Sequence, residues 1–314
     1  MVRYIGSKLA QLVVITFFIS VLTFLLVHLL PGDPTFSILG PNDTVQARHQ
    51  LLQQLGLNKS LPAQYWTWIA NVLHGNLGSS FLTHQTVTNA IGVAFPIDLE
   101  LIIVSQLLAF VVSIPLALFA ALRPNRPFDR VTTTSTYALL AVPTFVVAVL
   151  LVLVVAVKIH VFPATGFTPL SQDFGGNLKT VLLPSIALAV GSIAIYYRLL
   201  RADLIATLQE DYITMARSKG LSTPYILLRH ALRPSSFALL AGAGISIGAL
   251  FTGAFVVEVL FQLPGIGYQL IQSINSRDYL MVQGMALVAA VAYVVINFGV
   301  DIALTALDPR VRRG

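Results

Sequence analysis

Long apolar runs alternate with short polar segments along most of the chain. A helix needs about 20 apolar residues to cross the core of a bilayer. Six runs meet this requirement: residues 9–30, 99–122, 131–157, 181–199, 237–260 and 281–306. The first run is too long for the core of a cleaved signal peptide, and no small-residue cleavage site follows it, so we expect a retained anchor span. The pattern therefore predicts an all-α, polytopic membrane protein with six transmembrane helices.

Two polar segments between the spans are long enough to hold structure of their own. Residues 31–96 form a long loop in which an aromatic and apolar cluster, Tyr65, Trp66, Trp68 and Ile69, follows leucines at helical spacing. This loop is predicted to be a small helical cap at the membrane surface. It fits an interfacial aromatic belt and a docking surface for an external protein equally well. The second segment, residues 201–234, separates the fourth and fifth spans.

The composition supports the membrane assignment and the charge gives an orientation. The chain is 56% hydrophobic and only 10% charged, whereas a soluble domain carries roughly 25% charged residues. Fourteen of the 19 lysines and arginines fall on the side of the N-terminus. The positive-inside rule therefore predicts that both termini lie in the cytoplasm. The net charge of +6 then reflects topology rather than a nucleic-acid surface.

Several motifs of enzymes and metal sites are absent. The sequence contains no cysteine, no G-x-x-x-x-G-K-[ST] loop and no H-E-x-x-H motif, so we expect no cofactor in this chain. Residues 244–248 read GISIG and match the G-x-S-x-G hydrolase elbow in letters. That elbow requires a strand-to-helix turn, whereas these residues lie inside the fifth span and favour close helix packing. An intramembrane serine hydrolase that uses Ser246, with His28 as a base, and a receptor-like anchor whose outer loop binds a partner remain alternatives.

Prolines and charges within the spans mark places where a simple helix is disturbed. Pro115, Pro143 and Pro184 fall within the second, third and fourth spans, where proline permits kinks. Asp98 begins the second span, where its side chain is predicted to snorkel to the outer surface. Glu258 lies near the outer end of the fifth span, where an ionisable residue is costly.

The polar segment between the fourth and fifth spans is itself patterned. Leu208, Tyr212, Met215 and Ala216 recur at helical spacing and predict a helix over residues 206–219. Gly220 is a natural C-terminal stop. The resulting amphipathic knob fits a basic helix on anionic lipid or a docking element for a cytoplasmic partner.

This segment, DYITMARSKGLSTPYILLRHALRP, resembles the cytoplasmic coupling loop of inner-membrane permeases of ABC importers, in the form used by the dipeptide/oligopeptide subfamily (its B-type permease subunit). It departs from the general importer pattern at Thr214, Met215, His230 and Pro234, and these departures match the subfamily. Further resemblances are LGLNKSLPAQYWTWIANVLHGNLGSSF to the first outer loop, EVLFQLPGIG and RDY to the last outer loop, and LDPRVR to the C-terminal end. Together they cover most of the chain in the right order.

The resemblance implies a permease subunit that is not itself an enzyme. It implies an anchor span (1–30), an extracytoplasmic loop (31–96), a core permease domain (97–306) with the coupling loop 201–234, and a cytoplasmic tail (307–314). Its implied partners in a bacterial inner membrane are a second permease, two cytoplasmic ATPase subunits that bind ATP and Mg, and an extracytoplasmic solute-binding protein. The implied cargo is a small peptide, although nickel, glutathione and other small cargo share the pattern. The implied ATPase-coupling residues are Asp211, Tyr212, Ala216, Arg217, Lys219 and Gly220.

A second candidate site lies near the outer end of the fifth span. Glu258 is followed by a turn that contains Pro264, Gly265 and Gly267. A charge beside a Gly/Pro turn motivates the hypothesis that these residues shape the outer gate or the contact with the binding protein.

Overall fold

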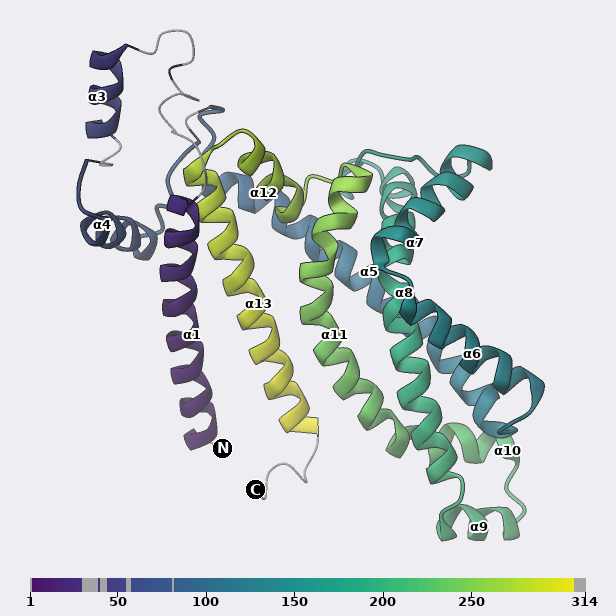
Figure 1. Ribbon diagram of the computed structural model, residues 1–314. Helices are drawn as coiled ribbons and strands as arrows, with labels where there is room; N and C mark the ends of the chain where they lie inside the picture. Colours follow the sequence, from purple (N-terminus) through teal and green to yellow (C-terminus); the bar gives the residue numbers. More distant parts are fainter. Residues whose placement is uncertain (1, 30–38, 40–43, 55–57, 81, 308–314) are drawn as a thin grey trace. The chain divides into compact units, whose positions relative to one another are not determined.

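A computed structural model describes residues 2–29, 39, 44–54, 58–80 and 82–307 (Figure 1). The regular elements within these residues are helices: α1 (Val2–Leu29), α3 (Val45–Gln54), α4 (Leu61–Leu73), α5 (Val87–Leu122), α6 (Pro127–Ala141), α7 (Thr144–Leu151), the π-helix η2 (Val152–Lys158), α8 (Phe174–Thr207), α9 (Asp211–Ser218), α10 (Thr223–Tyr225), the π-helix η3 (Ile226–Ala231), α11 (Leu232–Phe261), α12 (Ile266–Asn275) and α13 (Tyr279–Leu307). The described residues form no strand, which confirms the all-α prediction. The predicted tail lies outside them except for Leu307, as does most of residues 30–43.

Among the residues that the structure describes, five helices are long and apolar enough to cross a membrane, and the bent pair Pro127–Ala141 with Thr144–Lys158 brings the number to six if it is one span. The predicted third span is thus broken, with a bend of 101° between the two members of the pair. Val142 is extended, with φ −89° and ψ 122°, as expected for a residue before a proline. Pro143 is the N-cap of α7. The prediction of a kink is confirmed at Pro143, whereas α5 and α8 continue through Pro115 and Pro184.

The chain divides into two compact units, and the division cuts through α5 and α13. One unit comprises Met1–Asp98 and Pro264–Val295, and the other comprises Leu99–Leu263 and Ile296–Gly314. The first unit therefore holds α1, α4 and α12, and the second holds α6 to α11.

An aromatic cluster fixes α4 within the first unit. Tyr65 and Trp68 are buried and pack against Phe24 of α1 and Leu287 of α13. The Tyr65 ring lies edge-on to Phe24, with 5.5 Å between the ring centroids. Trp66, in contrast, is 66% exposed. Two of the aromatic residues that predicted a surface cap are thus part of a core, and Trp66 is left facing outward.

The second unit is built around α8, which lies beside α11 and packs against α6 and α7 (Figure 1). Its core contains the fully buried side chains of Tyr196, Tyr197, Leu200 and Leu204. The hydroxyl of Tyr196 donates a hydrogen bond of 2.6 Å to Gln106 of α5. A polar contact of this kind satisfies a buried hydroxyl and fixes the helix register at the same time.

The GISIG segment lies in the interior of α11, so Ser246 is a helical residue and the strand-to-helix turn of a hydrolase elbow does not form there. A Cβ atom at Gly248 would lie 2.6 Å from the side-chain nitrogen of Asn297, which confirms the packing interpretation for this glycine. His28 contacts the Phe24 carbonyl through Nδ1 at 2.7 Å and Gln64 through Nε2 at 3.0 Å. Both of its ring nitrogens are thus engaged, contrary to what the hydrolase alternative requires of a base.

Candidate coupling and gating sites

The predicted helix over residues 206–219 is two helices rather than one. The structure ends α8 at Thr207 and begins α9 at Asp211. The break arises because Glu210 adopts an extended conformation, with φ −69° and ψ 149°, at the N-cap of α9. Asp211 in the first turn and Arg217 in the last turn complement the dipole of this new helix. The predicted knob is thus a separate eight-residue helix beyond the C-terminal end of α8 (Figure 1).

Two buried side chains attach α9 to the second unit. Ile213 is fully buried and Ala216 is 7% exposed. Both belong to the core cluster that also contains Leu204 of α8 and Ile226 and Leu227 of η3. Ala216, predicted as a coupling residue, therefore faces inward, and it can position the helix but not touch a partner. A helix this short is unstable alone. Its shape depends on this packing.

The turn after α9 is set by a glycine. Gly220 has φ +80°, a left-handed conformation that suits glycine. Its N–H donates to the Arg217 carbonyl at 2.9 Å, and the N–H of Leu221 donates to the Ala216 carbonyl at 3.3 Å. These two bonds form a Schellman motif, which closes the carbonyl end of a helix. The predicted helix stop at Gly220 is confirmed, and the motif fixes the direction in which the chain leaves α9.

The outward face of α9 is mixed in character. Asp211, Arg217 and Lys219 are exposed, and Tyr212 and Met215 are 43% and 59% exposed. The Tyr212 hydroxyl donates to the backbone carbonyl of His230 at 3.4 Å. Partial burial, together with the charge of Glu210, raises the pKa of the Tyr212 phenol, so this hydroxyl keeps its proton. Apolar side chains ringed by charges are typical of a protein-binding surface.

The chain passes from one unit to the other just before Pro264, the first residue of the turn predicted as a gate. Glu258 in α11 is fully buried, and its carbonyl accepts the N–H of Leu263 at 2.9 Å. Pro264, Gly265 and Gly267 belong to the other unit, where Gly265 is the N-cap of α12. The structure thus groups the three turn residues but assigns Glu258 to a different unit.

Asp98 holds the start of α12, and this role was not predicted from the sequence. Its side chain is 1% exposed, so the prediction that it snorkels to the surface is wrong. The two carboxylate oxygens lie 3.2 and 3.4 Å from the backbone nitrogen of Ile266, which donates to them. A carboxylate at the N-terminus of a helix is favoured by the unpaired N–H groups and the dipole. Asp98 therefore fixes the turn that contains Gly265.

A second buried carboxylate, Asp278 of the RDY sequence, organises the start of α13. It accepts a hydrogen bond from the hydroxyl of Ser80, and the N–H of Met281 donates to it at 3.3 Å. The Ser80 oxygen in turn accepts the N–H groups of Leu82 and Thr83 at 3.1 and 2.9 Å. The resemblance of RDY to the last outer loop of importer permeases was the only sequence signal for this site.

Metal binding has no support in the described part of the chain. No group of three or more histidine, aspartate or glutamate side chains converges there in a way that could hold an ion. The candidate sites are an attached helix with an exposed face and a helix terminus held by a carboxylate.

Comparison with known proteins agrees with these features. Residues 113–313 match the family described as binding-protein-dependent transport system inner membrane component, and residues 1–102 match its N-terminal family. The chain is 33% identical over 312 residues to the glutathione transport system permease protein GsiC of Escherichia coli strain K12, covering 99% of each chain. It is 35% identical over 316 residues to a putative peptide transport system permease protein of Brucella abortus strain 2308, again over 99% of each. The chain therefore belongs to the inner-membrane permease components of binding-protein-dependent ABC transport systems, as its resemblance to importer permeases predicted.

Proposed function

We propose that this chain forms half of the translocation pathway of an ATP-driven importer of small peptides, with glutathione included in that class. The relatives named for peptide and for glutathione transport support this cargo, because they match the chain over 99% of its length. A nickel importer, which shares the sequence pattern, is the competing cargo assignment.

The observation that carries the mechanism is the attached helix α9. Its inward face is fixed by Ile213 and Ala216, and its outward face presents Tyr212 and Met215. A rigid knob of this kind can convert the closure of a partner into movement of the helices to which it is attached. In the proposed complex, α9 and Gly220 dock on a cytoplasmic ATPase, and both termini lie on the same side. ATP and Mg are bound by two such ATPase subunits, beside a second permease and an extracytoplasmic binding protein.

Purification of the tagged chain from its native membrane in a mild detergent, followed by mass spectrometry, tests this arrangement. We expect a second permease and two ATPase chains to be recovered with it. Replacement of residues 211–220 by a Gly/Ser segment of equal length should remove the ATPases but leave the second permease. Recovery of the chain alone, or retention of the ATPases by the replaced variant, would contradict the proposal.

The cargo is tested separately with the complete importer in proteoliposomes. Uptake of a labelled dipeptide and of glutathione, driven by ATP and dependent on the binding protein, is the expected result. Uptake of nickel without uptake of either peptide would replace the cargo assignment and leave the coupling mechanism intact.

We also propose that Glu258 and the turn 264–267 contribute to the outer gate. In this proposal Asp98 is a positioning residue, because it holds the first N–H of α12. Loss of a carboxylate at such a position costs about 1 kcal/mol. We expect Asp98→Ala and Glu258→Ala each to lower uptake stimulated by the binding protein, while the ATPases are still recovered with the chain. Unchanged stimulated uptake in the Glu258 variant would remove that residue from the gate.

A further inference from the structure

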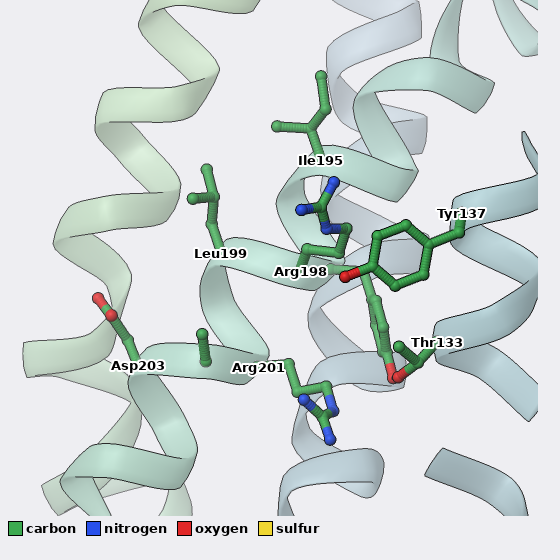
Figure 2. A pocket seen from close by; sticks show the side chains of 9 residues that line it. Thr133, Tyr137, Ile195, Arg198, Leu199, Arg201 and Asp203 are labelled. Carbon is green, nitrogen blue, oxygen red and sulfur yellow. The ribbon is translucent and has the colours of Figure 1, made fainter. Parts of the chain in front are cut away.

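A groove between α6 and α8 combines charged and apolar side chains in its lining. It has a volume of about 390 Å³, within the usual range of roughly 300–1,000 Å³ for small-molecule sites. Thr133 and Tyr137 of α6 form one wall, and Ile195, Arg198, Leu199 and Ala202 of α8 are among the residues of the other. Figure 2 shows the Arg198 side chain lying against the Tyr137 ring at this groove.

An aromatic ring, rather than a carboxylate, holds the Arg198 side chain there. Its guanidinium carbon lies 4.7 Å from the centroid of the Tyr137 ring, a cation–π contact that holds the group in place. Among the described residues, no carboxylate forms an ion pair with it. The neighbouring Arg201 is instead paired with Asp129. Asp203 also lines the groove, but Figure 2 shows its carboxylate pointing away from Arg198.

The groove is lined in part by polar side chains although both of its helices belong to membrane-crossing segments. Thr133 contributes a hydroxyl from α6, and Arg198 and Asp203 contribute charged groups from α8. Polar and charged side chains in membrane-embedded helices usually face other helices or a water-filled path rather than lipid. An exposed arginine beside these polar groups therefore favours an aqueous path at the groove.

From this geometry we infer that the groove is a cargo subsite in which Arg198 binds the terminal carboxylate of a transported peptide. A guanidinium group binds a carboxylate through two parallel hydrogen bonds. The contact with Tyr137 holds the Arg198 guanidinium in a restricted orientation. Ile195, Leu199 and Ala202 give the same groove an apolar wall for the side chains of the peptide. The inference rests on the proposed peptide cargo and assigns one residue to its recognition.

The absence of cysteine from the chain allows a direct test with the complete importer in proteoliposomes. Ala202→Cys places a single thiol in the exposed lining of the groove, and its modification by a cationic, membrane-impermeant thiosulfonate is followed on this chain with and without a dipeptide. We expect saturating dipeptide to slow modification about tenfold when Arg198 is present. When Arg198→Gln is combined with the cysteine substitution, dipeptide should no longer protect the thiol from modification. Arg198→Lys should retain part of this protection. Amidation of the dipeptide's carboxyl group should weaken the protection in the same way.

Two matched controls separate this role from general damage. Arg130→Gln removes another exposed arginine of α6 and should leave the protection unchanged. Val111→Cys, on an apolar and 69% exposed position of α5, should show no peptide-dependent modification. Equal protection with arginine and glutamine at 198 would overturn the inference. So would a thiol at 202 that never reacts, which would indicate a groove filled by lipid. Absence of dipeptide uptake by the unsubstituted importer would refute the proposed cargo itself, whereas uptake without Arg198-dependent protection refutes the inference alone.

Discussion

Replacement of Arg201 by glutamine is expected to lower the free energy of unfolding by roughly 3 kcal/mol, because it leaves a buried carboxylate without its counter-ion. Asp129 is 2% exposed and accepts hydrogen bonds from the Arg201 guanidinium, with one contact of 2.6 Å. The backbone N–H of Asn125, in the turn before α6, also donates to it at 2.7 Å. The pair thus fastens the α5–α6 turn and the start of α6 to α8. Unfolding by sodium dodecyl sulfate in mixed micelles measures the change.

The matched control removes both charges of this pair. Asp129→Leu combined with Arg201→Met leaves no buried ion, and replacement of a whole pair by apolar residues is often neutral. We therefore expect the double variant to be more stable than Arg201→Gln alone, by at least about 1 kcal/mol. If the single and double variants unfold alike, the ion pair does not hold α6 to α8.

Substitution of Met215 by glutamate is expected to reduce recovery of the ATPase subunits about tenfold without unfolding the chain. Met215 is the most exposed apolar side chain of α9, at 59%. Burial of a new charge in an apolar contact carries a penalty of at least about 1.4 kcal/mol, which corresponds to this factor. Co-purification with the tagged chain, quantified by mass spectrometry, measures the loss.

Two comparisons show whether the loss arises at the docking face. Met215→Leu conserves size and apolar character, so it should keep the ATPases bound. Because exposed substitutions usually change stability by no more than about 0.5 kcal/mol, the detergent melting temperature of the glutamate variant should match that of the unsubstituted chain. Undiminished ATPase recovery with glutamate at 215 would place the docking surface elsewhere.

The membrane helices were predictable because apolar length alone determines which segments can span a bilayer. The break before α9 was not. Leu208 and Tyr212 have helical spacing, but the extended backbone at Glu210 separates them into different helices. Periodicity reports which residues share a face and does not report where a turn interrupts the helix. The sequence likewise marked Pro143 as a kink but could not supply the bend of 101°.

The buried carboxylates were missed for a different reason. Asp98 meets Ile266 across 168 residues and Asp278 meets Ser80 across 198 residues. Contacts so distant along the chain leave no local pattern in a single sequence. Asp98 therefore read as an ordinary charge at the end of a span. The C-terminal end of α9 was predictable by contrast, because its determinants, Gly220 and the basic side chains before it, are neighbours in the sequence.

The π-helix η3 joins α10 to α11 without a break in helical backbone and contacts α9. A π-turn amounts to one residue more than an α-helix needs, and each residue of an α-helix accounts for about 100° of rotation. The angular phase between α9 and α11 therefore depends on a single extra residue. Insertions or deletions in this stretch would rotate α9 about the axis of α11. The length of Ile226–Ala231 is therefore constrained more tightly than its composition.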